Sequence, residues 1–133
     1  MNDDLEFVKT HINAYADYEE ERVRADSDMR VRAYVGSRLT EAQSRLHAEL
    51  DAATAKAVED VLMRCMFSDQ VFVRKFEHAR LDGSMVSALV RSDRALIELG
   101  DRATAVTSTH LLDLVIEIDK QFEYRRSPEP LEA

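Results

Sequence analysis

Glycine, proline and cysteine are scarce in this sequence, and tryptophan is absent. The 133 residues include three glycines, two prolines and one cysteine. Sheet folds of this size need frequent turn residues between short strands, and these are missing. The lone cysteine, Cys65, excludes an internal disulfide. The composition therefore predicts an all-α fold, namely an antiparallel helical bundle of four to six helices.

Long apolar runs and a leader-like N-terminus are also missing. No run approaches the roughly 20 apolar residues that a membrane-spanning helix needs. The chain opens with Asp3, Asp4 and Glu6, where a secretory leader would be basic. A single cysteine suits a reducing compartment. We therefore expect a cytoplasmic protein that does not interact with a membrane.

Positive charge is in the minority, with 18 basic against 26 acidic residues and a net charge of -8. This balance argues against nucleic-acid binding, which depends on phosphate neutralisation. Residues 22–45 are rich in arginine, but most of these arginines follow an acid by four residues, the favourable spacing for intrahelical pairs. The pairs are Glu20/Arg24, Asp26/Arg30, Asp28/Arg32 and Glu41/Arg45. We expect a solvated helix face there and no nucleic-acid partner.

The length suits one domain, which we expect over residues 1–126, followed by a disordered tail over 127–133. Helix ends are indicated at Asp82-Gly83-Ser84 and Leu99-Gly100-Asp101, where a glycine precedes a residue that can cap the next helix. A softer break is indicated at Asp26-Ser27-Asp28. The expected helices cover 3–25, 28–53, 55–80, 84–99 and 101–125, and the third has an alternative break at Ser68-Asp69.

Apolar spacing predicts which side of each helix is buried. Residues 28–53 carry a narrow stripe of coiled-coil spacing that indicates one long packing partner. Residues 55–80 have a broad apolar face that includes Met66, and Met63, Phe67 and Val71 recur at four-residue spacing on the opposite side. Monomers rarely expose such a contiguous patch. Either another helix of the same bundle covers it, or it forms a homodimer interface.

Four acids fall on apolar helix faces: Glu19, Asp69, Asp93 and Asp119. An ionised carboxylate that is buried alone costs several kcal/mol, so such groups are paired, hydrogen-bonded or metal-bound. One interpretation is structural, with helix caps and with Arg22, Arg91 and Arg94 as pairing donors. The other is a Mg²⁺ or Mn²⁺ site that holds a phosphate substrate in the bundle core.

Recognisable catalytic motifs are missing. The sequence has no Glu-x-x-His pair of the diiron type, no two-histidine zinc helix and no glycine-rich phosphate loop. We therefore predict a non-enzymatic bundle without a cofactor that acts through protein–protein interaction, as an adaptor, a regulator or a small chaperone, and that forms a homodimer. The alternative is a divalent-metal- or small-ligand-binding bundle, such as a phosphate-ester hydrolase, that uses the four acids above.

Overall fold

The computed structural model describes residues 3–130, and these contain helices and no strands. The expected all-α bundle is confirmed. In chain order the elements are α1 (Asp3–His11), η1 (Glu21–Val23), α2 (Arg24–Leu46), η2 (His47–Glu49), α3 (Ala52–Met66), α4 (Gln70–Phe76), α5 (Gly83–Ala103) and α6 (Ser108–Arg125). Within the described range, no helix combines the length and the apolar composition needed to cross a membrane.

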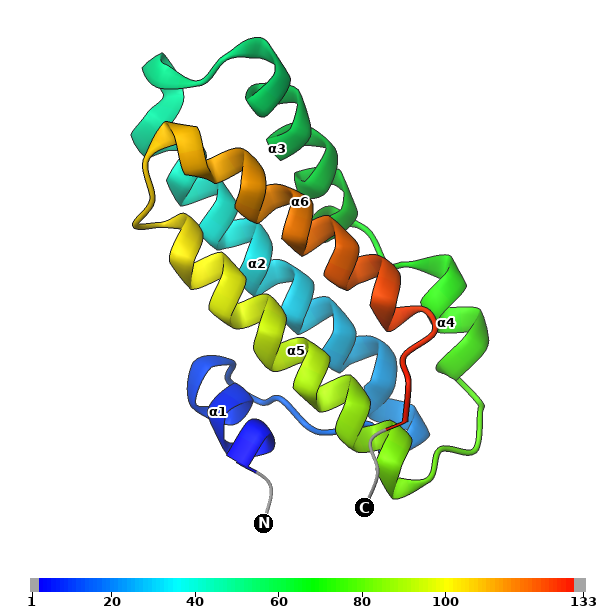
Figure 1. The fold of residues 1–133 in the computed structure, drawn as a ribbon. Coiled ribbons are helices and arrows are strands. Elements are labelled where there is room, and N and C mark those ends of the chain that lie inside the picture. Colours follow the sequence, from blue (N-terminus) through cyan, green and yellow to red (C-terminus); the bar gives the residue numbers. More distant parts are fainter. Residues whose placement is uncertain (1–2, 131–133) are drawn as a thin grey trace.

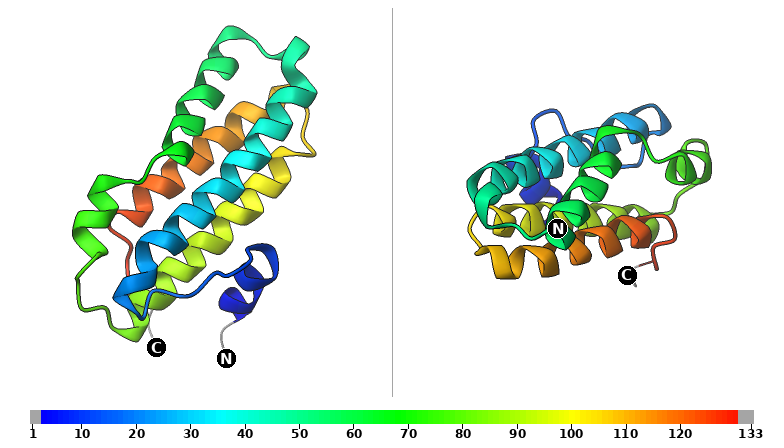
Figure 2. Two further views of the ribbon diagram at one scale, coloured as in Figure 1. Left: turned by 180° about the vertical axis from the view of Figure 1, so that it is seen from behind. Right: turned by 90° about the horizontal axis from the view of Figure 1, so that it is seen from above.

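Four long helices form the bundle, and the chain runs up and down alternately through them (Figure 1). Helix α2 packs against α3 and α5, and α6 packs against the same two helices from the other corner. Figure 2 shows α2 and α3 side by side on the rear face. Helix α4 lies in the long connection from α3 to α5, and α1 packs against α5.

The predicted stripe of α2 forms the centre of the core. Its buried apolar side chains face α3 and α5, and they are Val31, Val35, Leu39, Ala42 and Leu46. Gly36 allows a close approach of α2 and α3, since a Cβ added there would lie 3.1 Å from the Cβ of Cys65. A larger side chain at this position would push the two helices apart.

The expected helix over 3–25 is wrong. Helix α1 ends at His11, and Ala14 has a φ of 62°, a left-handed conformation that residues other than glycine rarely adopt. The irregular segment that follows buries Tyr15 and Tyr18 against the bundle. Tertiary packing of these two tyrosines therefore overrides the local helical pattern.

The expected break at Leu99-Gly100-Asp101 is also wrong, because α5 runs through it to Ala103. Gly100 is buried, and an added Cβ would lie 3.5 Å from the Cβ of Arg38 on α2. The glycine therefore serves close packing between α5 and α2 rather than a helix end. Close packing therefore explains the glycine that the sequence pattern indicates as a helix end.

Four smaller expectations have mixed outcomes. Asp26-Ser27-Asp28 lies inside α2 and does not end a helix, whereas the alternative break at Ser68-Asp69 is confirmed. The expected cap at Ser84 is wrong, because α5 begins at Gly83 with Asp82 as its N-cap, and the side chain of Asp82 accepts a hydrogen bond from the backbone N–H of Met85. In the tail over 127–133, Pro128 is buried. Residues 131–133 lie outside the described range, and the disorder of the tail stays a prediction.

Candidate functional site

A polar network lies inside the bundle, and Asp93 of α5 is at its centre with no exposed surface. The hydroxyls of Tyr15 and Tyr18 donate to Asp93 Oδ2 at 2.6 and 2.5 Å. Arg125 of α6 donates from Nη1 to Asp93 Oδ1. It also donates from Nη2 to Asp28 Oδ1 of α2 at 2.6 Å. The network therefore joins the N-terminal segment, α2, α5 and α6.

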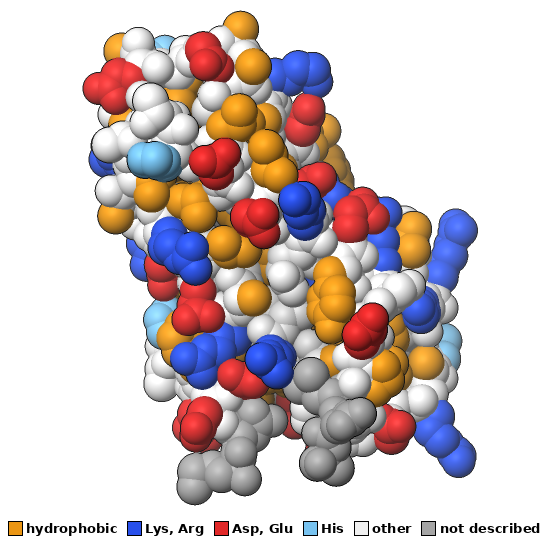
Figure 3. Space-filling view, in the orientation of Figure 1, with side chains coloured by type: hydrophobic (Ala, Val, Ile, Leu, Met, Phe, Trp, Pro, Cys, Tyr) orange, Lys and Arg blue, Asp and Glu red, His pale blue; other side chains and the backbone are white. Residues whose placement is uncertain are grey.

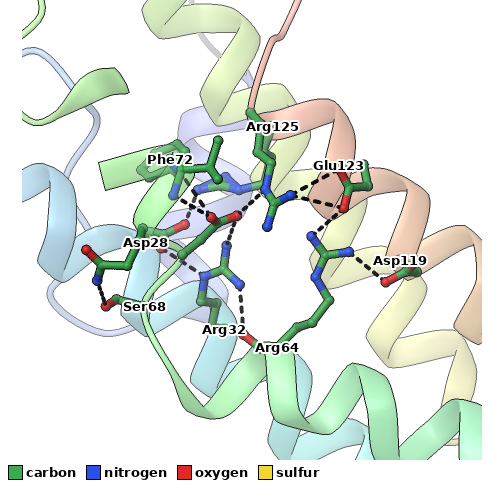
Figure 4. A network of polar contacts seen from close by, with 12 residues as sticks. Asp28, Arg32, Arg64, Ser68, Phe72, Asp119, Glu123 and Arg125 are labelled. Atoms are coloured by element: carbon green, nitrogen blue, oxygen red, sulfur yellow. Dashed lines mark hydrogen bonds and ion pairs between the residues drawn. The ribbon is translucent and has the colours of Figure 1, made fainter. Parts of the chain in front are cut away.

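The network continues from Asp28 towards the surface (Figure 4). Arg32 Nε donates to Asp28 Oδ2 at 2.9 Å, and Arg32 Nη1 donates to the backbone oxygen of Arg64 at 2.8 Å. Arg126 Nε donates to Asp69 Oδ2 at 2.7 Å. Asp69 Oδ1 accepts from the first backbone N–H groups of α4. The same carboxylate therefore caps a helix and pairs with an arginine.

The four predicted acids do not share a pocket. Asp93 is separated from Asp69 by Arg125, Asp28 and Arg32, and Asp119 pairs with Arg64 at 2.7 Å near the surface. The side chain of Glu19 is exposed. Among residues 3–130, no three His, Cys, Asp or Glu side chains are grouped so that they could hold a metal ion. The convergence that a Mg²⁺ or Mn²⁺ site requires is not formed by these acids.

The predicted pairing donors are wrong. Arg22 pairs with the exposed Glu20, Arg94 pairs with Asp4 and Glu98, and the side chain of Arg91 is exposed. Sequence reasoning missed the arginines that reach the acids on the apolar faces. These are Arg32, Arg64, Arg125 and Arg126.

The pair Asp28/Arg32 is buried, so its assignment to a solvated face is wrong. A signal for its burial exists in the sequence. Asp28 lies three residues before Val31, and Arg32 lies three before Val35, so both share the side of α2 that carries the apolar stripe.

Burial shapes the acid–base properties of the network. It raises the pKa of Asp93, and Arg125 together with the two tyrosine hydroxyls opposes that rise. Burial also acts to raise the pKa of Asp69, but hydrogen bonds from Arg126 and from the backbone of Phe72 outweigh it and hold this pKa below its usual value. The ionised form is therefore better stabilised at Asp69 than at Asp93.

The cysteine has the properties of a core residue. Burial raises the pKa of the Cys65 thiol to about 12, although Arg32 and Arg64 oppose the rise. Thiolates, rather than thiols, are the reactive form of cysteine. Cys65 is therefore protonated at neutral pH and packs against Gly36.

Apolar side chains are exposed together at the junction of α3 and α4. We define the α3–α4 surface as Met63, Met66, Phe67 and Val71, whose exposed fractions are 55%, 65%, 60% and 51%. The expectation that Met66 faces the core is therefore wrong, because α3 ends at this residue. On the face drawn in Figure 3, by contrast, hydrophobic groups alternate with charges of both signs.

Two hollows adjoin the α3–α4 surface. A pocket of about 260 Å³, here called the arginine pocket, is lined by three members of that surface and by Arg32, Arg64, Ser68, Asp69, Gln70 and Arg126. A groove of about 490 Å³ runs between α2 and α3 and is lined in part by Gly36, Gln43, Glu59 and Met63. Met63 and Arg32 line both hollows. Exposed apolar side chains and charged side chains are therefore adjacent at the α3–α4 surface.

The chain matches no protein-family model, no curated protein and no solved structure. Its function is argued below from the geometry alone.

Proposed function

We propose that this protein acts by binding protein through the α3–α4 surface, and that its first partner is a second copy of the same chain. The role is that of a non-enzymatic adaptor, regulator or small chaperone. The buried network supports this class of function, because Asp93, Asp28 and Arg125 are closed off from solvent and are engaged with one another.

The observation that carries the proposal is the exposure of four large apolar side chains within nine residues of sequence. Full burial of one such side chain contributes about 1.5–3 kcal/mol. The monomer lacks this stabilisation because the side chains stay exposed, whereas a complex in which a partner covers the patch gains it. The adjoining groove between α2 and α3 extends the area that a partner would cover.

Replacement of Phe67 with serine tests the proposal. Central aromatic residues of an interface cost about 2 kcal/mol or more when truncated, so the Phe67→Ser variant is expected to raise the dimer dissociation constant at least about 30-fold. Sedimentation velocity over a concentration series measures this constant. Ile116→Ser is the matched control, because Ile116 is 43% exposed on α6 and lines neither the arginine pocket nor the groove. A wild-type protein that remains a 15.2 kDa monomer at the highest concentration measured would refute self-association.

A further inference from the structure

The arginine pocket contains a buried donor without an acceptor. Arg32 has 1% of its surface exposed, and its Nη2 has no hydrogen-bond partner within residues 3–130. Arg32 Nη2 forms an ion pair with Asp69 Oδ2 at 3.6 Å, but this distance is too long for a hydrogen bond, and the same oxygen accepts from Arg126. A buried donor that stays unsatisfied carries a desolvation cost that no hydrogen bond offsets. An acceptor from outside the described chain would remove that cost.

A second donor lies at the rim of the same pocket. Arg126 uses Nε for Asp69 and Nη1 for Glu123, and no hydrogen bond of its Nη2 occurs in the described part of the chain. About a third of the Arg126 side chain is exposed. Arg32 Nη2 and Arg126 Nη2 thus offer two guanidinium donors to one incoming carboxylate, the acceptor that arginine prefers.

The exposed face of α3 carries acids immediately before the apolar patch. Glu59, Met63 and Phe67 follow at four-residue spacing, so Glu59 and Met63 lie on one side of the helix and Phe67 continues that line where the helix ends. Glu59 lies slightly more than one turn, about 6 Å along the helix axis, before Met63. Its Oε1 accepts from Gln43 at 2.6 Å, which orients the side chain. Along α3, Glu59 therefore lies on one side of Met63, and the arginine pocket lies on the other side, next to Phe67.

This order is self-complementary under two-fold symmetry. In a symmetric dimer, a residue that contacts a second position is contacted by that position in turn. If two α3 helices cross in antiparallel directions at Met63, the residue four before it in one copy faces the residue four after it in the other. Glu59 of one copy then lies over Phe67 of the second copy, at the mouth of the arginine pocket.

We infer that a second copy of this chain docks on the α3–α4 surface in this antiparallel register, and that Glu59 of each copy enters the arginine pocket of the other. The inference rests on the proposed function and specifies its partner and register. This register also opposes the mutual repulsion expected of two chains with a net charge of -8 each, because each copy brings a carboxylate to guanidinium groups. Apolar contacts supply affinity, and the charge pairs fix the register.

Charge reversal in separate chains tests the register. In a homodimer of the Glu59→Lys variant, a lysine faces Arg126 at both symmetry-related contacts. In a homodimer of the Arg126→Glu variant, Glu59 faces a glutamate at both contacts. Each variant is expected to raise the dimer dissociation constant at least about 100-fold. Mixed together, they form a heterodimer in which one contact is wild-type and the other is an exchanged ion pair. Its dissociation constant is expected to return to within about 10-fold of the wild-type value.

The controls are Glu49→Lys and Arg102→Glu, which make the same changes in charge at exposed positions without side-chain hydrogen bonds or ion pairs in the described range. They are expected to leave the dissociation constant within about threefold of wild type. Two folded single variants that associate as weakly when mixed as when alone would overturn the inference. A wild-type monomer would refute the proposed function as well. A dimer sensitive to Phe67→Ser but not to Glu59→Lys would refute the register only.

Arg126 also holds Asp69, the N-cap of α4, so reversal of its charge can disturb that helix. Glu59→Gln and Arg126→Gln provide a milder test. If the two side chains meet across the interface, the double variant weakens association by less than the sum of the two single effects. Additive effects would overturn the inference. Circular dichroism of each variant verifies that its helical content is unchanged.

Discussion

Asp93→Ala is expected to lower the free energy of unfolding by about 3–5 kcal/mol, the cost of removing one partner from a buried ion pair. The substitution leaves Arg125 buried with Asp28 as its remaining carboxylate. It also leaves the hydroxyls of Tyr15 and Tyr18 without the acceptor that both use. Urea denaturation followed by circular dichroism measures the effect.

Asp119→Ala is the matched control. Asp119 is also paired with an arginine, Arg64, but about half of its side chain is exposed. Exposed pairs contribute about 0–1 kcal/mol, so this variant is expected to stay within about 1 kcal/mol of wild type. Equal losses for Asp93→Ala and Asp119→Ala would contradict the central position assigned to Asp93.

Arg24→Met is expected to lower the free energy of unfolding by about 3 kcal/mol, because several backbone oxygens lose their donor. The buried Arg24 guanidinium donates to the backbone oxygens of Tyr18 at 2.8 Å, Phe76 at 2.8 Å and Ala79 at 2.6 Å. It thereby ties the N-terminal segment and the end of α4 to the start of α2. Methionine replaces the aliphatic part of the arginine side chain with an unbranched apolar chain but has no N–H group.

Arg22→Met is the internal comparison, two residues earlier in the chain. The side chain of Arg22 is 81% exposed and pairs only with Glu20 within the described residues. Its removal is expected to change the free energy of unfolding by at most about 0.5 kcal/mol. If thermal or urea denaturation shows the same loss for both arginines, the bridging role of Arg24 is wrong.

The sequence predicts the long helices because their buried faces have a regular period. Val31, Val35 and Leu39 recur at four-residue spacing, and this spacing alone identifies the side of α2 that faces the core. The same reasoning places Met63, Phe67 and Val71 on the side opposite the core, and the structure leaves all three exposed rather than covered by another helix of the bundle. Local patterns suffice where one helix has one buried face.

The polar network could not be predicted in this way, because its partners are far apart in the chain. Tyr15 and Asp93 are separated by 78 residues, and Arg125 and Asp28 by 97. No helical period relates positions at such distances. The acid on the apolar face of α5 indicated that a partner must exist, but only the fold identifies Arg125 as that partner.

The break after α1 has a similar origin. Nothing local favours a left-handed conformation at Ala14. The conformation is retained because it allows Tyr15 and Tyr18 to turn into the bundle, where their hydroxyls meet Asp93. A long-range gain therefore offsets a local cost that the sequence pattern does not reveal.

Oxidative cross-linking at Met63 tests the symmetric α3–α4 interface most directly. In the proposed register, the two copies of residue 63 face each other across the symmetry axis, where a disulfide can form if the Cα atoms approach within about 7 Å. The variant carries Met63→Cys together with Cys65→Ser, so that one thiol remains per chain. The comparison variant carries Ala48→Cys, an exposed position on η2, in the same Cys65→Ser background. We expect rapid conversion of the Met63→Cys protein to a reducible dimer of twice the 15.2 kDa chain mass. Cross-linking no faster than that of the Ala48→Cys protein would contradict the interface.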